Sequence, residues 1–311
     1  MTNVLILALD AAEYRPHLEK SLGPDCSVAA AISVEQARNL SPSVDVILGQ
    51  PDLVAEFLVD GANVSWVQST WAGITPLLEL GRRDYILTGV KDTFGPQISE
   101  YVFAYLLARE VKLLERLGRQ AHKHWWQEPS DTLEGKTLGV MGCGSIGQHV
   151  AQTGRHFGMK TVGLSRSGGG VDGFETVYAL EAISHFLALP DYLVCALPET
   201  PETKGLLGQN EFTLMKRGCY LVNVGRGSLV DEKALIGALE EGRLAGASLD
   251  VFCEEPLPEG DALWHAENAL VTAHIAARSR PADIAAIFLA NFECFRRGTT
   301  MNYLIDFDRG Y

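Results

Sequence analysis

The chain reads TLGVMGCGSIGQHVAQTGRHF over residues 137–157. Its first five residues form a mostly apolar run, and the segment after Gly147 has helical spacing, so a strand, a glycine loop and a helix are predicted in that order. Gly142 permits the tight turn, Gly144 lets backbone approach a pyrophosphate, and Gly147 lets the helix pack closely on the strand. The helix N-terminus offers N–H groups to the phosphates. A tight turn without a ligand is the alternative, because the chain holds 31 glycines. The predicted cofactor contacts of this loop are Gly142, Gly144, Ser145, Ile146 and Gly147.

The next predicted strand ends in a basic tripeptide, Ser165-Arg166-Ser167. NAD enzymes usually place Asp or Glu at this strand end, where it accepts a hydrogen bond from the ribose 2′-hydroxyl. Here Ser165 takes that place, and the Arg166 guanidinium would attract a 2′-phosphate, with further contacts from the hydroxyls of Ser165 and Ser167. The alternative is that Arg166 is an ordinary solvated loop arginine. The sequence therefore favours NADP(H) over NAD(H).

Short apolar segments alternate with helical segments on both sides of this loop. A long helical pattern over residues 97–120 separates two such series, and a further helical pattern begins at Pro281. This alternation predicts an α/β protein with two doubly wound parallel sheets, each covered by helices on both faces. The predicted strands are residues 4–9, 26–33, 44–49, 65–69 and 85–89 in the first series, and 137–141, 161–165, 192–197, 220–224, 247–251 and 269–273 in the second.

Composition excludes several functional classes. At 311 residues the chain has room for about two domains. Its formal net charge of −13 argues against nucleic-acid binding, which needs a basic face. No apolar run approaches the ~20 residues of a membrane span, and the apolar N-terminus lacks the basic region of a signal peptide. The six cysteines form no C-x-x-C pair, so we expect reduced thiols in a cytoplasmic protein, without disulfides or a metal site.

Three polar positions fall at or near the ends of successive strands in the second series. The carboxyl ends of parallel strands form the ligand crevice of such sheets. Arg226 stands between two glycines, which would leave its guanidinium room to meet a carboxylate. Asp250 falls in an apolar strand and needs a partner, because a lone buried carboxylate is costly; Glu254 and Glu255 follow it. His274 ends the last strand. A turn arginine, solvated glutamates and a core histidine are the alternatives.

Together these segments resemble the D-isomer-specific 2-hydroxyacid dehydrogenase family. The upstream sequence WVQSTWAG at residues 66–73 is similar to the family's substrate loop, and residues 99–101 are similar to its linking helix. The chain length and residues 308–311 look most like the NADPH-dependent glyoxylate/hydroxypyruvate reductases. The matching segments of the second series are LGVMGCGSIG (138–147), LPETPET (197–203), LVNVGRG (221–227), LDVFCEEPLP (249–258) and TAHIAA (272–277).

The resemblance implies a homodimer of two-domain chains with the active site in a cleft between the domains. A discontinuous flavodoxin-like substrate domain would comprise residues 1–97 and 281–311, and a Rossmann-type dinucleotide-binding domain would comprise residues 98–280. Arg226 would bind the substrate carboxylate and carbonyl, His274 would be the acid/base, and Glu255 would be its partner.

The resemblance also implies further contacts. Asp250 would contact the nicotinamide end of the site, and the backbone N–H groups of Ala72 and Gly73 would hold the substrate carboxylate. Trp71 stands where many members of the family have a small residue. The remaining implied cofactor contacts are Leu197, Pro198, Thr203, Val224 and Ala277.

The predicted function is hydride transfer from NADPH to a small 2-keto acid, with glyoxylate or hydroxypyruvate as the substrate. One alternative is a non-catalytic dinucleotide-sensing protein of the same fold, against which the intact set of Arg226, Glu255 and His274 argues. A dehydrogenase acting on a larger D-2-hydroxy acid is another, as is phosphoglycerate dehydrogenase. Formate dehydrogenases have glutamine where Glu255 stands.

Overall fold

The computed structural model describes residues 1–40 and 43–310, and its backbone contacts divide the chain into two units. Unit 1 is Met1–Thr93 with the segment that begins at Ser279, and unit 2 is Phe94–Arg278. The chain passes from unit 1 to unit 2 between Thr93 and Phe94 and returns between Arg278 and Ser279. The last residue of the 308–311 motif, Tyr311, lies outside the described residues.

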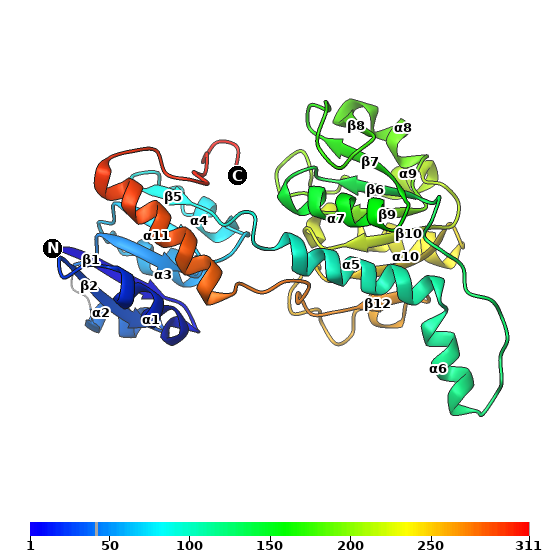
Figure 1. Ribbon diagram of the computed structural model, residues 1–311, viewed down its shortest axis with the longest axis horizontal. Helices are drawn as coiled ribbons and strands as arrows, with labels where there is room; N and C mark the ends of the chain where they lie inside the picture. Colours follow the sequence, from blue (N-terminus) through cyan, green and yellow to red (C-terminus); the bar gives the residue numbers. More distant parts are fainter. Residues whose placement is uncertain (41–42, 311) are drawn as a thin grey trace. The chain divides into compact units, whose positions relative to one another are not determined.

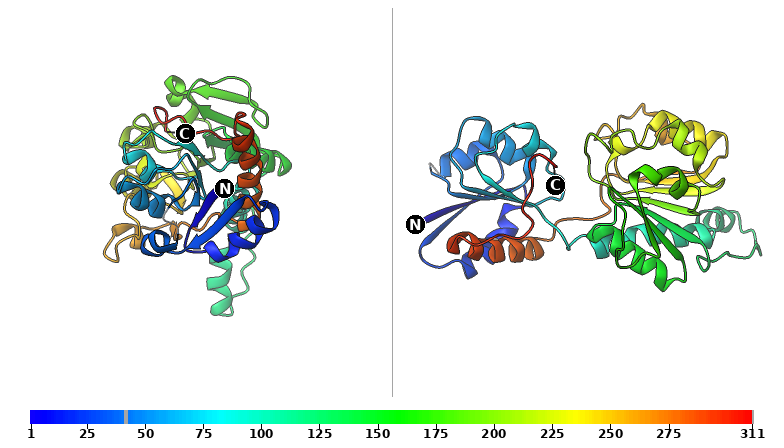
Figure 2. Two further views of the ribbon diagram at one scale, coloured as in Figure 1. Left: turned by 90° about the vertical axis from the view of Figure 1, so that its left-hand side faces the viewer. Right: turned by 90° about the horizontal axis from the view of Figure 1, so that it is seen from above.

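Unit 1 contains a parallel sheet with the strand order β2-β1-β3-β4-β5, the flavodoxin-like order of a doubly wound fold. Helices α1 and α11 pack together on one face, and α2, α3 and α4 follow one another on the other (Figure 2). Every residue of β3 and β4 is buried, as expected for strands covered on both sides. The elements are β1 (Thr2–Leu7), α1 (Ala11–Ser21), β2 (Cys26–Ala31), α2 (Val34–Leu40), β3 (Val46–Gly49), α3 (Pro51–Val59), β4 (Trp66–Ser69), α4 (Thr75–Glu79), β5 (Ile86–Thr88) and α11 (Pro281–Arg297).

The C-terminal helix α11 is part of the unit 1 core although it is far from that unit in sequence. The Trp66 ring of β4 stacks on Phe288 of α11, with ring centroids 4.9 Å apart. Deeper in the same interface, the Asn291 side-chain amide donates to the Gln68 side-chain oxygen at 3.0 Å, and both residues are fully buried. Burial of an apolar face and of a satisfied polar pair therefore explains why unit 1 is discontinuous.

Unit 2 contains a parallel sheet with the strand order β12-β11-β10-β9-β6-β7-β8 (Figure 1). Helices α5 and α7 pack together, while α9 contacts both α8 and α10. The chain runs outward in opposite directions from the neighbouring strands β6 and β9, so the glycine loop after β6 lies at the topological switch point, where ligands bind in such sheets. The elements are α5 (Gly95–Glu110), α6 (Leu113–Ala121), β6 (Thr137–Met141), α7 (Ser145–His156), β7 (Lys160–Ser165), β8 (Thr176–Ala179), α8 (Ile183–Leu187), β9 (Tyr192–Cys195), α9 (Gln209–Leu214), β10 (Cys219–Asn223), α10 (Glu232–Glu240), β11 (Leu244–Leu249) and β12 (Ala269–Val271).

Several strands end earlier than predicted, and one strand was missed. Strand β11 ends at Leu249, so Asp250 is the first residue after the strand and not a residue within it. The prediction was wrong there because Val251 and Phe252 continue the apolar run beyond the hydrogen-bonded ladder. The missed strand, β8, is a short edge strand of which no residue is buried, so it lacks a strong apolar signal.

The helical pattern predicted over residues 97–120 is two helices. Helix α5 ends at Glu110, and Lys112 adopts a left-handed conformation with φ 52°, which a continuous helix cannot contain. Helix α6 then extends away from the sheet of unit 2, and none of its residues is buried (Figure 1). In the described part of the chain, no helix is long and apolar enough to span a membrane.

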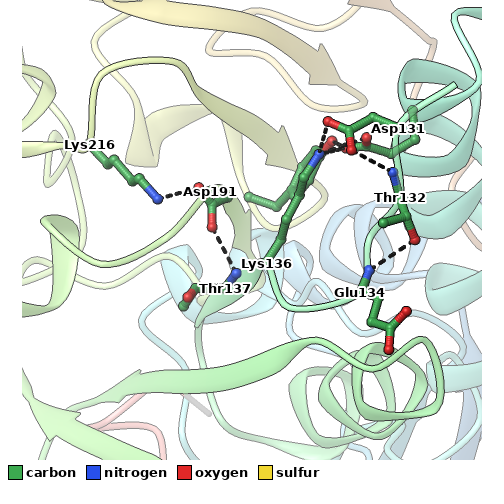
Figure 3. A network of polar contacts seen from close by, with 9 residues as sticks. Asp131, Thr132, Glu134, Lys136, Thr137, Asp191 and Lys216 are labelled. Carbon is green, nitrogen blue, oxygen red and sulfur yellow. Dashed lines mark hydrogen bonds and ion pairs between the residues drawn. The ribbon is translucent and has the colours of Figure 1, made fainter. Parts of the chain in front are cut away.

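A polar network closes the amino-terminal edge of the unit 2 sheet (Figure 3). Lys136 donates to both carboxylate oxygens of the buried Glu110 at 2.7 Å and to Asp131 at 3.0 Å. Beside it, Lys216 donates to Asp191 at 2.5 Å. These residues, apart from Lys216, help to line a cavity of about 270 Å³. Because the network lies where the strands begin, it stabilises the edge opposite the glycine loop and pairs an otherwise costly buried carboxylate.

Candidate active site

The three glycines of the loop after β6 have different surroundings. Gly142 has φ 103°, and a Cβ there would lie 2.6 Å from the carbonyl oxygen of Ala196. A Cβ on Gly147 would lie 1.9 Å from the carbonyl oxygen of Gly142, so the helix can start only with a glycine at this place. A Cβ on Gly144 would meet no atom within 4 Å. The first and third glycines therefore serve the chain's own packing, and the second leaves an open side to the loop.

Helix α7 begins directly after this loop, and its N-terminus suits an anion. Gly144 is the N-cap residue and provides no side chain to accept from the first N–H groups of the helix. The first turn, which includes Ser145 and Ile146, contains no acidic residue. Unpaired N–H groups and the positive end of the helix dipole favour a phosphate here. The loop and helix thus fit the pyrophosphate of a dinucleotide.

The loop after β7 places a positive charge near the loop after β9. Ser165 is the last residue of β7, and its hydroxyl accepts from the N–H of Gly168 at 3.0 Å. Arg166 and Ser167 are exposed. The pKa of Glu202 is lowered by hydrogen bonds from its own backbone and from Thr200, and the positive charge of Arg166 contributes as well.

Five more predicted cofactor contacts lie in loops that follow strands, at the same edge of the sheet as the glycine loop. The Thr203 hydroxyl donates to the carbonyl of Pro198 at 2.7 Å and accepts from the N–H of Thr200 at 2.8 Å, so it shapes the loop after β9. The Val224 N–H, just after β10, donates to the carbonyl of Cys195 at 3.1 Å. The other two are Leu197, after β9, and Ala277, after β12.

The glycines beside Arg226 are required by neighbouring backbone, and the room that they would leave for the guanidinium stays a prediction. A Cβ on Gly225 would lie 2.9 Å from the carbonyl oxygen of Leu197, and a Cβ on Gly227 would lie 1.9 Å from the carbonyl carbon of Phe252. The loops after β9, β10 and β11 therefore touch backbone to backbone. This close packing fixes where the Arg226 side chain starts.

Arg226 is a partly buried cation near two carboxylates. Its guanidinium donates to the carbonyl of Gly225 at 2.6 Å. Burial lowers the pKa of Arg226, while the negative charges of Glu199 and Glu255 act in the opposite direction. A guanidinium so placed stays charged and is less hydrated than one in solvent, which strengthens its attraction for an anionic ligand.

His274 and Glu255 form the pair that the resemblance implies. The His274 Nδ1 lies 2.7 Å from the Glu255 Oε2, and the Oε1 of the same carboxylate accepts from the N–H of Phe252 at 2.9 Å. The carboxylate is thus fixed to the loop after β11 and orients the ring. Because Nδ1 faces Glu255, Nε2 is the nitrogen left to exchange a proton with a ligand. The His274 side chain is 52% exposed, so a ligand can reach it.

The buried Asp250 carboxylate builds the turn that carries His274. Its Oδ1 accepts from the hydroxyl of Thr272 at 2.5 Å and from the N–H of Ile275 at 2.9 Å, and its Oδ2 accepts from the N–H of Ala276 at 2.8 Å. His274 itself donates its N–H to the carbonyl of Asp250 at 2.8 Å and has the left-handed φ of 53°. The partner that Asp250 requires is therefore this turn, and neither glutamate provides it. Its implied contact with the nicotinamide stays a prediction.

Comparison with known proteins shows the family. Residues 103–276 match the NAD-binding domain of the D-isomer specific 2-hydroxyacid dehydrogenases. The chain belongs to this family. It is 32% identical to the glyoxylate/hydroxypyruvate reductase A of Serratia proteamaculans over 264 residues. The aligned residues cover 82% of this chain and 84% of that protein.

Solved structures of family members have the same fold over the whole chain. A D-isomer specific 2-hydroxyacid dehydrogenase family protein from Aeromonas salmonicida is 40% identical, with a TM-score of 0.94 and 99% of each chain covered. An NADPH-dependent glyoxylate/hydroxypyruvate reductase from Sinorhizobium meliloti, solved with NADP and sulfate, is 28% identical, with a TM-score of 0.88 and all of each chain covered. As a 2-hydroxyacid dehydrogenase family member, the chain carries a nicotinamide dinucleotide site on unit 2.

The predicted substrate loop of this family member belongs to unit 1 and follows β4. The Ser69 hydroxyl donates to the carbonyl of Trp71 at 2.7 Å and accepts from its N–H at 3.0 Å, which makes a tight turn. The Trp71 side chain is 43% exposed. Within the described residues, the N–H groups of Ala72 and Gly73 have no acceptor. These two groups suit a carboxylate, and their predicted role stays a prediction.

Two residues near His274 were not predicted. Thr272 donates to Asp250, and the hydroxyl of Tyr101 lies 2.7 Å from the Thr272 Oγ1. Both residues fall inside segments that resemble family motifs. Their place in those segments is the signal that could have found them.

Proposed function

We propose that this protein reduces small 2-keto acids such as glyoxylate or hydroxypyruvate to 2-hydroxy acids, with NADPH as the reductant. The observation that carries the proposal is the His274–Glu255 pair, 2.7 Å apart, on a left-handed turn at the sheet edge that also bears the glycine loop and Arg226. The names of the Serratia and Sinorhizobium relatives support the choice of substrate and cofactor.

Each residue has a role that follows from charge. When bound, the reduced nicotinamide supplies a hydride to the keto carbon. Arg226 binds the substrate carboxylate and stabilises the negative charge that develops on the carbonyl oxygen. Protonated His274 delivers the proton from Nε2 to that oxygen, and Glu255 holds the ring through Nδ1. One hydride and one proton convert the carbonyl group to a hydroxyl group. The N–H groups of Ala72 and Gly73 bind the carboxylate.

Catalytic efficiency with NADPH is expected to exceed that with NADH by at least ~10-fold, because one charge-assisted contact contributes ~1.5–3 kcal/mol. Arg166 provides that contact with the 2′-phosphate, and the strand end offers Ser165 in place of a repelling carboxylate. Arg166→Ala should therefore lower the catalytic efficiency with NADPH much more than the catalytic efficiency with NADH. Initial rates with both cofactors measure this. Equal efficiencies in the unmutated enzyme would contradict the preference.

The protein is a cytoplasmic homodimer in this proposal, with a second copy covering α6. Leu113, Leu114 and Leu117 expose 43%, 56% and 52% of their surface on this helix, and Trp125, in the loop after it, exposes 86%. Exposed apolar side chains in such a group mark an interface.

The cysteines agree with a cytoplasmic location in this proposal. All six are free, and Cys195 and Cys219 are buried, as suits a reducing compartment.

The variant Leu114→Glu/Leu117→Glu should be a monomer, since it puts two charges into the proposed interface. Light scattering should give about twice the chain mass of 33.8 kDa for the unmutated protein and the single mass for the variant. Gln120→Glu, on the same helix, is the control and should stay dimeric. A monomeric unmutated protein would contradict the homodimer.

A further inference from the structure

Helix α5 holds the segment that carries His274 at two points. Gln97 and Tyr101 lie four residues apart, on one face of this helix. The hydroxyl of Tyr101 is 2.7 Å from the Thr272 Oγ1. The side-chain amide of Gln97 donates to the carbonyl of Arg278 at 3.0 Å and accepts from the N–H of Arg278 at 3.3 Å. The catalytic turn therefore lies between two anchors on one rigid helix.

In the contact between Tyr101 and Thr272, only one of the two hydroxyls can be the donor. A threonine hydroxyl has one hydrogen, and Thr272 donates it to the Asp250 Oδ1 at 2.5 Å. Tyr101 must therefore donate to the Thr272 oxygen. Burial raises the pKa of Tyr101, which keeps its hydroxyl protonated for that purpose. The result is a one-way chain of hydrogen bonds from Tyr101 through Thr272 to the Asp250 carboxylate.

This chain ends on the group that shapes the turn. The Asp250 carboxylate also accepts from the N–H groups of Ile275 and Ala276. These two hydrogen bonds close the turn after His274. Between Thr272 and Ile275, His274 occupies the left-handed region, which residues with a Cβ rarely adopt without support. A strained conformation of this kind persists only where the surroundings hold it.

We infer that Tyr101 and Gln97 are positioning residues that hold His274 in its catalytic orientation, Tyr101 through Thr272 and Asp250, and Gln97 through the backbone of Arg278. The inference rests on the proposed acid/base role of His274. Neither residue is assigned a contact with substrate or cofactor, so each should act on the chemical step and not on binding.

A double-mutant cycle tests the series. Tyr101→Phe should lower kcat for reduction by about 3- to 10-fold, and Thr272→Val by about 10- to 30-fold, since small losses of orientation are costly. Because Tyr101 acts only through Thr272, the double variant should match Thr272→Val alone. Thr272→Ser keeps the hydroxyl and should restore kcat to within about 2-fold. The Kd for NADPH should stay within about 2-fold throughout.

Hydrogen exchange provides a readout that does not depend on activity. The amides of Ile275 and Ala276 should exchange faster in Tyr101→Phe and Thr272→Val, and the amide of Arg278 should exchange faster in Gln97→Ala. Tyr220→Phe is the matched control, because it removes a buried hydroxyl that faces Ser248 at 2.8 Å in the same sheet. This variant should change neither kcat nor the exchange rates of these amides.

Unchanged kcat and unchanged amide exchange in Tyr101→Phe would overturn the inference. Additive losses of kcat in the double variant would show that Tyr101 does not act through Thr272. If Thr272→Val does not fold, Tyr101→Phe and Thr272→Ser decide the matter. Should His274→Ala keep full activity, the proposed function fails, and the exchange data still show whether α5 holds the turn.

Discussion

Replacing His274 by alanine is expected to lower kcat for 2-keto acid reduction by on the order of 10²–10⁴-fold, the usual contribution of a positioned acid or base. The variant loses the group that delivers the proton, while the glycine loop and the start of α7 stay intact. NADPH affinity should therefore change little. Steady-state rates and a fluorescence titration with NADPH measure the two effects separately.

The pH dependence distinguishes the acid role from a structural one. Reduction needs His274 protonated, so its rate should fall as the pH rises and the ring loses its proton. Oxidation of the 2-hydroxy acid needs the neutral ring, so its rate should rise over the same range. Both limbs should disappear in His274→Ala. His265→Ala, which removes an exposed histidine of the same unit, is the control and should behave as the unmutated protein. Near-normal reduction by His274→Ala would mean that this histidine is structural.

Replacing Arg226 by lysine is expected to lower kcat/KM by on the order of 10²–10³-fold, although the positive charge is kept. Lysine lacks the planar fork that binds a carboxylate through two parallel hydrogen bonds. KM should rise and kcat should fall, because the guanidinium binds the substrate and stabilises the charge that develops on its carbonyl oxygen. Initial rates over a range of glyoxylate concentrations measure the two constants.

An aldehyde without a carboxylate isolates the binding role of Arg226. It should be a poor substrate of the unmutated enzyme, and Arg226→Lys should affect it less than glyoxylate. Arg217→Lys changes an exposed arginine near the opposite edge of the same sheet and should leave both reactions as they are. Equal losses for the aldehyde and for glyoxylate would argue against a contact between Arg226 and the carboxylate.

The sequence predicts both parallel sheets because strands buried on both faces leave apolar runs that need no tertiary information. It does not predict where the helix after Glu110 breaks, since the apolar spacing continues through Lys112 while the backbone there turns left-handed. Edge strand β8 escapes prediction for the opposite reason. It is half-exposed and short, so too little apolar surface marks it.

Within the candidate site, the sequence predicts residues better than it predicts their partners. His274 is found because it follows an apolar strand, whereas Glu255 is distinguished from Glu254 only by the resemblance to the family. The partners of Asp250 are backbone N–H groups of a turn, and no spacing of side chains shows them. The reason for Gly227 is likewise hidden, because it depends on the backbone of Phe252 in the neighbouring loop.

The most direct test is to follow NADPH oxidation by absorbance when glyoxylate or hydroxypyruvate is added to the purified protein. We predict turnover with one of these acids, with one 2-hydroxy acid formed for each NADPH consumed, and almost none in His274→Ala. Tight NADPH binding with no oxidation by any 2-keto acid would contradict the proposed function and would favour a dinucleotide-sensing protein.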